Sequence, residues 1–352
     1  MHRIRAFLER RPEPNERLES RRSRWLRLPA SRTGMSLESF LSLGPHGFHR
    51  IAYTAWGDRG SRRRVLCMHG LTRNARDFDW LARTLQRDSH VVCMDAAGRG
   101  ASEWLEHKPD YTFRLYQADA AALIARITAP ANGGREGAGR SANPGFSENS
   151  GAGDVGVDWI GTSMGGLIGM LLAAQPRSPI RRLVLNDVGP FVAWSALLRF
   201  KSNLMTRNTY PDREQAEAVL RQSCAAWGPI TEEQWAQLAQ HSILRTEDGQ
   251  YTFACDPRIA DATAWGFSPD ARVGTRNLLG LELWSVWANV RCPVLILRGK
   301  ESLVLLPETV ERMRRREAHT EVAEFDGVGH APALMAPDQI GVVRRFLSAK
   351  LG

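Results

Sequence analysis

The stretch that most constrains this chain is residues 157–174. A mostly apolar run, 157–160, leads directly into Gly161-Thr162-Ser163-Met164-Gly165, and a second apolar run of helical composition follows. A serine exposed at a sharp strand-to-helix turn requires strained backbone angles, and side chains two positions to either side would collide. Because glycines occupy both positions, we expect Ser163 to be a nucleophile. The positive end of the following helix would face a developing oxyanion.

The length and composition fit a water-exposed globular protein. A chain of 352 residues can form one large α/β domain with an insertion, or two ordinary domains, and we favour the first. Hydrophobic residues make up 43% of the chain and charged residues 24%, as in soluble domains. No apolar run approaches the roughly 20 residues that span a bilayer, so we expect no stable membrane insertion.

The positive charge is concentrated at the N-terminus. Of the formal net charge of +9, residues 1–34 contribute +6 through ten Arg and four Glu. The positive and negative charges of residues 35–352 nearly cancel, which argues against a nucleic-acid partner. Residues 1–34 lack the apolar core of a secretory signal, and their Glu residues are not typical of a transit peptide. We expect residues 1–44 to be a disordered basic tail; an anionic-surface anchor is the alternative, and Met35 is an alternative start.

Neither the cysteines nor the glycine-rich turns indicate a metal or a cofactor. Three of the five cysteines, Cys67, Cys93 and Cys292, lie in or beside strand-like runs and resemble small buried apolar residues. No metal-ligand spacing is present. The turn at 95–102 lacks the lysine of a P-loop and the third glycine of a dinucleotide fingerprint, so we interpret it as structural. We expect no metal or cofactor, and a reducing cytoplasmic location.

Alternating strand-like and helix-like runs predict an α/β fold, a mostly parallel central sheet flanked by helices. The core is assigned to residues 45–190 and 289–352. The predicted strands are 48–57, 65–68, 90–94, 157–160, 180–187, 294–298 and 321–325. The predicted helices of the core are 77–85, 114–127, 164–174 and a closing helix from Pro337.

Two segments interrupt this core. Residues 129–156 are rich in Gly, Ala, Ser and Asn, and predict a disordered low-complexity insertion. Residues 191–288 lose most of the strand signal and predict an inserted helical cap, with aromatic side chains shared between its own core and a pocket wall. Six of the eleven tryptophans lie there: Trp194, Trp227, Trp235, Trp265, Trp284 and Trp287.

The order of motifs resembles the α/β-hydrolase superfamily, in the branch with a helical cap that holds esterases, lipases and carbon-carbon bond hydrolases. The resemblance covers roughly residues 45–350. It is specific for the fold and implies much less about the substrate. The matching motifs are His69-Gly70, Asp95-x-x-Gly98-x-Gly100-x-Ser102, Gly161-x-Ser163-x-Gly165, Asp187 after a strand, and Gly329-His330-Ala331-Pro332.

The resemblance implies roles for four residues. Ser163 would be the nucleophile and His330 the base that takes its proton and later returns it to the leaving group. The oxyanion hole would consist of the backbone amides of Leu71 and Met164. A glycine-flanked loop at the end of a strand also suits a base, although His330 could be only structural.

The acid of the triad is where the chain departs from the family pattern. Relatives usually carry the acid in the loop after the strand at 294–298, and here Leu303 occupies that position. Asp187 and Glu301 both precede His330, as the order serine, acid, histidine requires. We favour Asp187, because it ends a rigid strand beside the serine strand; capping the following turn is its other interpretation. Glu301 is the alternative acid.

We therefore expect a serine hydrolase of carboxylic esters, acting through an acyl-enzyme on a small-molecule substrate. One alternative is a carbon-carbon bond hydrolase of a dioxo acid from aromatic degradation, with the acid held by Arg199, Lys201 and Arg207 of the cap. The other is a catalytically weakened hydrolase-fold binding protein, suggested by the missing acid. A dehalogenase is disfavoured, since such relatives use an aspartate nucleophile. The sequence leaves the physiological substrate and the oligomeric state open.

Overall fold

The computed structural model describes residues 34–129, 156–193, 195–196, 209–261, 280–316 and 319–349. Residues 1–33 of the predicted tail therefore lie outside the described residues. The predicted low-complexity insertion also lies outside them, apart from its two end residues. The same holds for Trp194 and Trp265 and for the cap residues Arg199, Lys201 and Arg207.

The centre of the molecule is an eight-stranded sheet with the strand order β1-β2-β4-β3-β5-β6-β11-β12. From β4 to β12 the neighbouring strands run parallel, whereas β2 is antiparallel to both β1 and β4. The predicted mostly parallel sheet is thus confirmed. The strands are β1 (Met35–Gly44), β2 (Gly47–Trp56), β3 (Arg64–Met68), β4 (His90–Met94), β5 (Val157–Thr162), β6 (Ile180–Asn186), β11 (Val294–Gly299) and β12 (Thr320–Phe325).

The predicted boundary of the N-terminal tail is wrong. Residues 35–44 were assigned to the tail, but they form β1, which pairs with β2 along its whole length. Ser42 donates a hydrogen bond of 2.6 Å to the buried Asp119, which fastens the strand to the helix below. The sequence does carry a strand signal here, because apolar and polar residues alternate, but the face that includes Leu41 and Leu43 is exposed rather than packed on a core.

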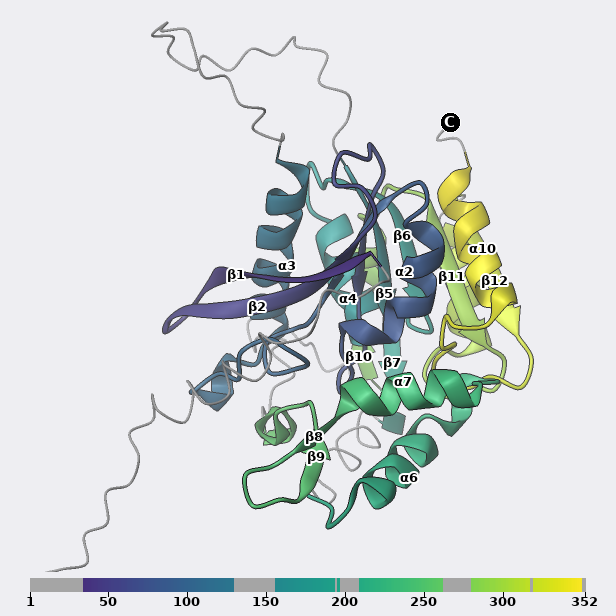
Figure 1. Cartoon of the computed structure of the whole chain (residues 1–352). Coiled ribbons are helices and arrows are strands. Elements are labelled where there is room, and N and C mark those ends of the chain that lie inside the picture. The colour runs from purple at the N-terminus through teal and green to yellow at the C-terminus, as the bar shows by residue number, and fades with distance from the viewer. Residues whose placement is uncertain are drawn as a thin grey trace, which may run out of the picture.

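Helices cover both faces of the sheet (Figure 1). On one face α3, α4, α8 and α9 share a core with the strands, in which Trp159 is fully buried. On the other face α2 and α10 share a second core with the strands, which includes Phe78 and Phe346. The helices are α2 (Asp79–Leu85), α3 (Phe113–Thr128), α4 (Met164–Ala173), α8 (Trp284–Trp287), α9 (Pro307–Arg316) and α10 (Pro337–Ser348), with the 3-10 turns η1 (Ala75–Phe78) and η2 (Lys108–Asp110).

The described part of the predicted cap has a small core of its own, below the sheet in Figure 1. It is less purely helical than expected, because it includes a hairpin and a two-stranded sheet. Trp284 and Trp287 pack into the main core, as do Cys255 and Ile259, so this segment shares its buried side chains with the sheet. The elements are β7 (Phe191–Ala193), α6 (Arg213–Ser223), η3 (Ala225–Trp227), α7 (Glu232–Ser242), β8 (Ile243–Arg245), β9 (Tyr251–Phe253), η4 (Pro257–Asp261) and β10 (Gly280–Glu282).

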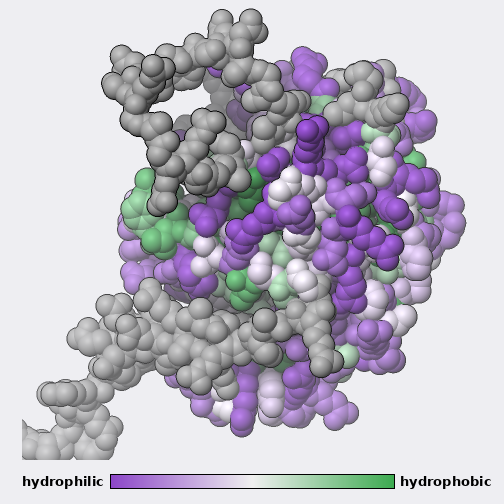
Figure 2. Space-filling model, turned by 45° about the horizontal axis from the view of Figure 1, so that its top comes forward, coloured by the Kyte–Doolittle hydropathy of each residue, from purple (hydrophilic) through white to green (hydrophobic). Residues whose placement is uncertain are grey.

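The face of the molecule drawn in Figure 2 is mostly polar. Exposed large apolar side chains include three at the end of the β1-β2 hairpin. Leu41, Leu43 and Phe48 are 66%, 64% and 69% exposed there. Across the described ranges, every helix is too short or too polar to cross a membrane.

Candidate active site

Ser163 stands at a strained turn between β5 and α4. Its φ is 51°, a left-handed conformation that a non-glycine residue adopts only when its surroundings impose it. A Cβ atom on Gly161 would lie 2.3 Å from the Gly165 carbonyl, and one on Gly165 would lie 2.0 Å from the Met68 carbonyl oxygen. Only glycines allow this close approach, which confirms the steric argument from the sequence.

The structure brings Ser163, His330 and Asp187 together at the carboxyl end of the sheet. The His330 Nε2 atom lies 3.0 Å from Ser163 Oγ, and the His330 Nδ1 atom lies 2.6 Å from Asp187 Oδ2. Asp187 is fully buried, and His330 lies in the loop between β12 and α10. The three side chains form one continuous hydrogen-bonded chain.

Asp187 is held by partners on two neighbouring segments. It directly follows β6, and its Oδ1 accepts a hydrogen bond of 3.1 Å from the Gly299 amide. Its Oδ2 also accepts a hydrogen bond of 2.5 Å from the hydroxyl of the buried Ser302. Both partners lie at the end of β11 and in the loop after it, not in the turn that follows Asp187, which the capping interpretation named. Ser302 was not predicted; its place beside Leu303, in the loop where the family carries its acid, was the available signal.

Glu301, the alternative acid, does not reach His330. Its backbone amide bonds to the Val328 carbonyl oxygen at 2.9 Å, and its side chain is exposed to solvent. Within the described part of the chain its carboxylate has no hydrogen-bond or ion-pair partner. Leu303 is likewise 62% exposed. Backbone pairing of the loop with Val328 leaves this side chain in solvent, so the geometry favours Asp187 over the alternative acid.

The loop after β3 places the Leu71 amide near the serine. A Cβ atom on Gly70 would lie 3.8 Å from the Cβ atom of Ser163. The Gly70 carbonyl accepts hydrogen bonds from His69 Nδ1 at 2.6 Å and from the Arg73 amide at 3.1 Å. These bonds fix the peptide that carries the Leu71 N–H. Among the described residues, no protein acceptor binds the Leu71 or Met164 amide.

His69 is a neutral donor in this loop. Its Nε2 atom accepts a hydrogen bond of 3.0 Å from the Ala96 amide, so the proton is on Nδ1, which faces the Gly70 carbonyl. Complete burial lowers the pKa of His69 to about 3. The ring therefore keeps one tautomer and holds the loop at neutral pH.

The segment around η3 holds the loop that carries His330. The Ala226 carbonyl accepts a hydrogen bond of 2.6 Å from the Gly329 amide, and the Trp227 carbonyl accepts one of 3.3 Å from the Ala333 amide. Thus the predicted cap fastens the loop on both sides of the histidine.

The Asp95 side chain stabilises its own turn, in line with the structural interpretation of this carboxylate. The Asp95 carboxylate accepts hydrogen bonds from the amides of Ala75 at 2.7 Å and Ala101 at 2.8 Å, and burial raises the pKa of Asp95 to about 6. The described residues contain no cluster of three or more His, Cys, Asp or Glu side chains suited to a metal ion.

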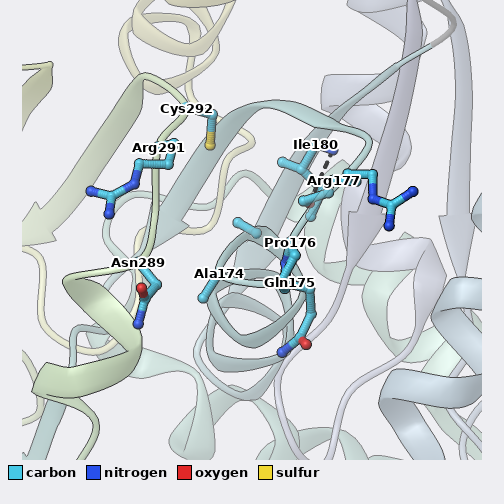
Figure 3. A pocket seen from close by; sticks show the side chains of 10 residues that line it. Ala174, Gln175, Pro176, Arg177, Ile180, Asn289, Arg291 and Cys292 are labelled. Carbon is cyan, nitrogen blue, oxygen red and sulfur yellow. Dashed lines mark hydrogen bonds between the residues drawn. The ribbon is translucent and has the colours of Figure 1, made fainter.

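A separate cavity of about 380 Å³ lies at the other end of α4, far along the helix from Ser163. Residues of the turn after α4 line it on one side, and Asn289, Arg291 and Cys292 line it on the other. The Arg177 and Arg291 guanidinium groups extend in opposite directions (Figure 3). The cavity contains none of the residues predicted for the active site.

Residues 65–340 match the model of the alpha/beta hydrolase family, and this range includes Ser163, Asp187 and His330. The chain belongs to the α/β-hydrolase family. It is 38% identical over 315 residues to the 3-hydroxybutyrate-oligomer hydrolase of Cupriavidus necator, covering 87% of this chain and 95% of that protein.

Solved structures of other α/β-fold hydrolases have the same architecture. A putative hydrolase from Rickettsia typhi has a TM-score of 0.74 and 26% identity, with 90% of this chain and 99% of that chain covered. An α/β hydrolase from Novosphingobium aromaticivorans has a TM-score of 0.70 and 28% identity, with the same coverage of 90% and 99%. This α/β hydrolase is therefore similar to hydrolases over nearly its whole described length.

Proposed function

We propose that this hydrolase cleaves carboxylic esters with Ser163 as nucleophile, His330 as general base and Asp187 as the acid that orients the base. The observation that carries the proposal is the unbroken chain of contacts from Asp187 through His330 to Ser163 Oγ, at 2.6 Å and 3.0 Å. A hydroxyl is a weak nucleophile at neutral pH, and a base within hydrogen-bond distance activates it by accepting its proton.

Acylation follows from this arrangement. The Ser163 oxygen attacks the ester carbonyl carbon while His330 Nε2 takes its proton, and Asp187 stabilises the imidazolium that forms. The carbonyl oxygen becomes an oxyanion that accepts hydrogen bonds from the Leu71 and Met164 amides. The C–O bond to the leaving alcohol then breaks, and His330 gives its proton to the departing oxygen.

Deacylation repeats the sequence with water. His330 takes a proton from a water molecule, the resulting hydroxide attacks the acyl carbon, and a second oxyanion forms at the same two amides. Collapse of this intermediate returns the proton to Ser163 Oγ and releases the carboxylic acid. Every proton is handled by His330, so the reaction requires no metal or cofactor.

For the substrate class, we propose short esters of hydroxy acids, such as linear oligomers of 3-hydroxybutyrate. Support comes from the 38% identical relative, which is named as a 3-hydroxybutyrate-oligomer hydrolase and is covered over 95% of its length. Of the two alternatives, carbon-carbon bond hydrolysis has no support from the described residues, since its proposed acid-binding residues lie outside them. The binding-protein alternative was suggested by a missing acid, and the contact between Asp187 and His330 removes that reason.

The test is turnover of p-nitrophenyl butyrate and of linear 3-hydroxybutyrate dimers and trimers, together with labelling by a fluorophosphonate probe. Wild type should turn over and be labelled. Ser163→Ala should lose labelling and about 10⁴-fold or more in kcat. Ser178→Ala, at the other end of α4, is the matched control and should behave as wild type. If wild type shows neither turnover nor labelling, the serine mechanism is wrong. Turnover of the butyrate ester without cleavage of the oligomers would overturn only the proposed substrate.

A further inference from the structure

Arg99 is a fully buried arginine that contacts both residues of the proposed oxyanion hole. It lies in the turn after β4, and its side chain is 0% exposed. Its Nε atom donates a hydrogen bond of 2.9 Å to the Leu71 carbonyl, and its Nη2 atom lies 3.6 Å from Met164 Sδ. One guanidinium group therefore touches the residues on both sides of the site where the substrate's carbonyl oxygen would lie.

All the partners of Arg99 are neutral. Its Nη1 atom donates to the Ala97 carbonyl at 2.7 Å and to the Tyr116 hydroxyl at 2.6 Å, and the Tyr116 ring lies 4.7 Å from the guanidinium carbon. Within the described ranges, no carboxylate forms an ion pair with it. Burying an unpaired charge is unfavourable, and such charges in proteins are normally paired. A cation kept without a counter-ion beside a reaction centre calls for a functional explanation.

The charge of Arg99 acts on the same loop. It is one of the causes that lower the pKa of His69, after the larger effect of burial. His69 in turn donates to the Gly70 carbonyl and so fixes the peptide bearing the Leu71 amide. Arg99 thus affects the loop at the Leu71 carbonyl and through the charge state of His69.

We propose that Arg99 is a positioning residue for ester hydrolysis, which holds Leu71 and Met164 in place and whose charge favours the anionic tetrahedral intermediate over the neutral ester. This inference rests on the proposed serine mechanism. A neutral ester carries no net charge, whereas the intermediate carries a full negative charge in a buried site. An unpaired cation nearby therefore stabilises the intermediate more than the ground state, which raises kcat with little effect on KM.

A merely structural role would have different consequences. If Arg99 only supported the turn, its loss would lower stability and would affect substrate and intermediate alike. Boronic acids distinguish these cases: Ser163 Oγ adds to the neutral boron, His330 takes the proton, and the adduct is a tetrahedral anion. Affinity for an alkylboronic acid therefore reports on stabilisation of the anion without any turnover.

The experiment compares wild type with Arg99→Met and Arg99→Lys. Tyr116→Phe removes one partner of the guanidinium while keeping its charge. Arg182→Met, which removes a buried arginine of β6 beside Asp158, controls for the loss of such a residue elsewhere. The measurements are kcat and KM for p-nitrophenyl butyrate, Kd for butylboronic acid and the melting temperature of each full-length variant.

For Arg99→Met we expect kcat to fall about 10- to 100-fold, somewhat less than the loss of an oxyanion-hole donor, while KM changes by less than about threefold. The Kd for the boronic acid should rise by a similar factor. Arg99→Lys, which keeps the charge, should fall between wild type and Arg99→Met, and both controls should stay close to wild type in kcat. If Arg99→Met does not fold, Arg99→Lys and Tyr116→Phe still test the prediction, because the lysine must lower kcat and the phenylalanine must not.

Unchanged kcat and unchanged boronic acid affinity in both Arg99 variants would overturn the inference. A rise in KM together with weaker binding of neutral ligands would also overturn it, because substrate and intermediate would then be affected alike. Failure of the proposed function looks different, since wild type itself would then lack turnover and boronic acid binding at Ser163, and Ser163→Ala would behave like wild type.

Discussion

Asp187 and His330 are 143 residues apart in the chain, and their Oδ2 and Nδ1 atoms lie 2.6 Å apart in the structure. The aspartate directly follows β6, not β11, whose following loop carries the exposed Leu303. Because β6 and β11 are neighbouring parallel strands, side chains after either strand can approach the same histidine. In the proposed triad the acid therefore follows β6, the strand next to β11.

The first prediction concerns this pair. Asp187→Asn should lower kcat for p-nitrophenyl butyrate by about 10³- to 10⁴-fold, because an amide neither holds the required tautomer of His330 nor stabilises its protonated form. The matched control is Glu301→Gln, which should stay within about twofold of wild type since its side chain is exposed. A collapse of activity in the control, with Asp187→Asn unaffected, would reverse the assignment.

Leu303→Asp, a second test, returns an acid to the position where the family usually carries it. Because Leu303 is exposed and Asp187 already contacts His330, kcat should remain within about twofold of wild type. A large gain in activity, measured with the same ester, would mean that Asp187 does not serve as the acid.

We expect Ser302 to affect both stability and activity, because it holds the Asp187 carboxylate. Its hydroxyl donates to Asp187 Oδ2 and accepts from the amides of Val304 and Leu305. Ser302→Ala leaves these buried groups without a partner, so we expect a loss of about 1–3 kcal/mol in the free energy of unfolding and a smaller fall in kcat than for Asp187→Asn. Urea denaturation and ester turnover measure both effects. Unchanged stability would show that water replaces the hydroxyl.

The glycines around the serine permit a steric test. Gly165→Ala would place a Cβ atom 2.0 Å from the Met68 carbonyl oxygen, so the protein should lose about 3 kcal/mol or fail to fold. Gly341→Ala is the control, because it lies within α10 and a Cβ atom there would meet only the end of Arg345 at 3.6 Å. It should be neutral or stabilising by up to about 1 kcal/mol in thermal unfolding.

Acid stability should depend on His69. Its pKa is about 3 when folded and 6.5 ordinarily, so between these values the unfolded chain binds a proton that the folded chain does not. Its contribution to stability is complete above pH 6.5 and is lost as the pH falls towards 3. The slope of unfolding free energy against pH should therefore be shallower in His69→Gln, by up to about 1.4 kcal/mol per pH unit.

Other groups contribute to the wild-type slope and cancel when the variant is compared with it. Burial lowers the pKa of His241 to about 3, which acts with the same sign, and raises the pKa of Asp95 to about 6, which acts with the opposite sign between pH 6 and 3.8. Identical slopes for the two proteins would mean that folding does not lower the pKa of His69.

Much of the fold could be predicted from local patterns. The strand-turn-helix run around Ser163, the strands of the parallel sheet and the closing helix from Pro337 all lie where periodicity and glycine spacing put them. Each such signal depends on residues that are near one another in the chain, since backbone sterics and amphipathic spacing act locally. β1 also carries an alternating pattern, since Met35, Leu37, Leu41 and Leu43 are separated by Ser36, Glu38 and Ser42, but the basic segment before it led to its assignment to the tail.

The remaining features depend on residues far apart in the chain. Asp187 and Glu301 both precede His330 in the chain, so the sequence left both open as the acid. In the structure the backbone of Glu301 pairs with Val328 and its carboxylate is exposed, whereas the carboxylate of Asp187 is buried. Ser302 and Arg99 had no motif that pointed to a role, because their importance comes from Asp187 in one case and from Leu71 and Met164 in the other. The sequence by itself determined the strand-turn-helix run that presents Ser163, because the flanking glycines act locally. The tertiary structure decided that Asp187 contacts His330 and that Arg99 contacts Leu71 and Met164, because those contacts form only when separate strand ends converge at one edge of the sheet.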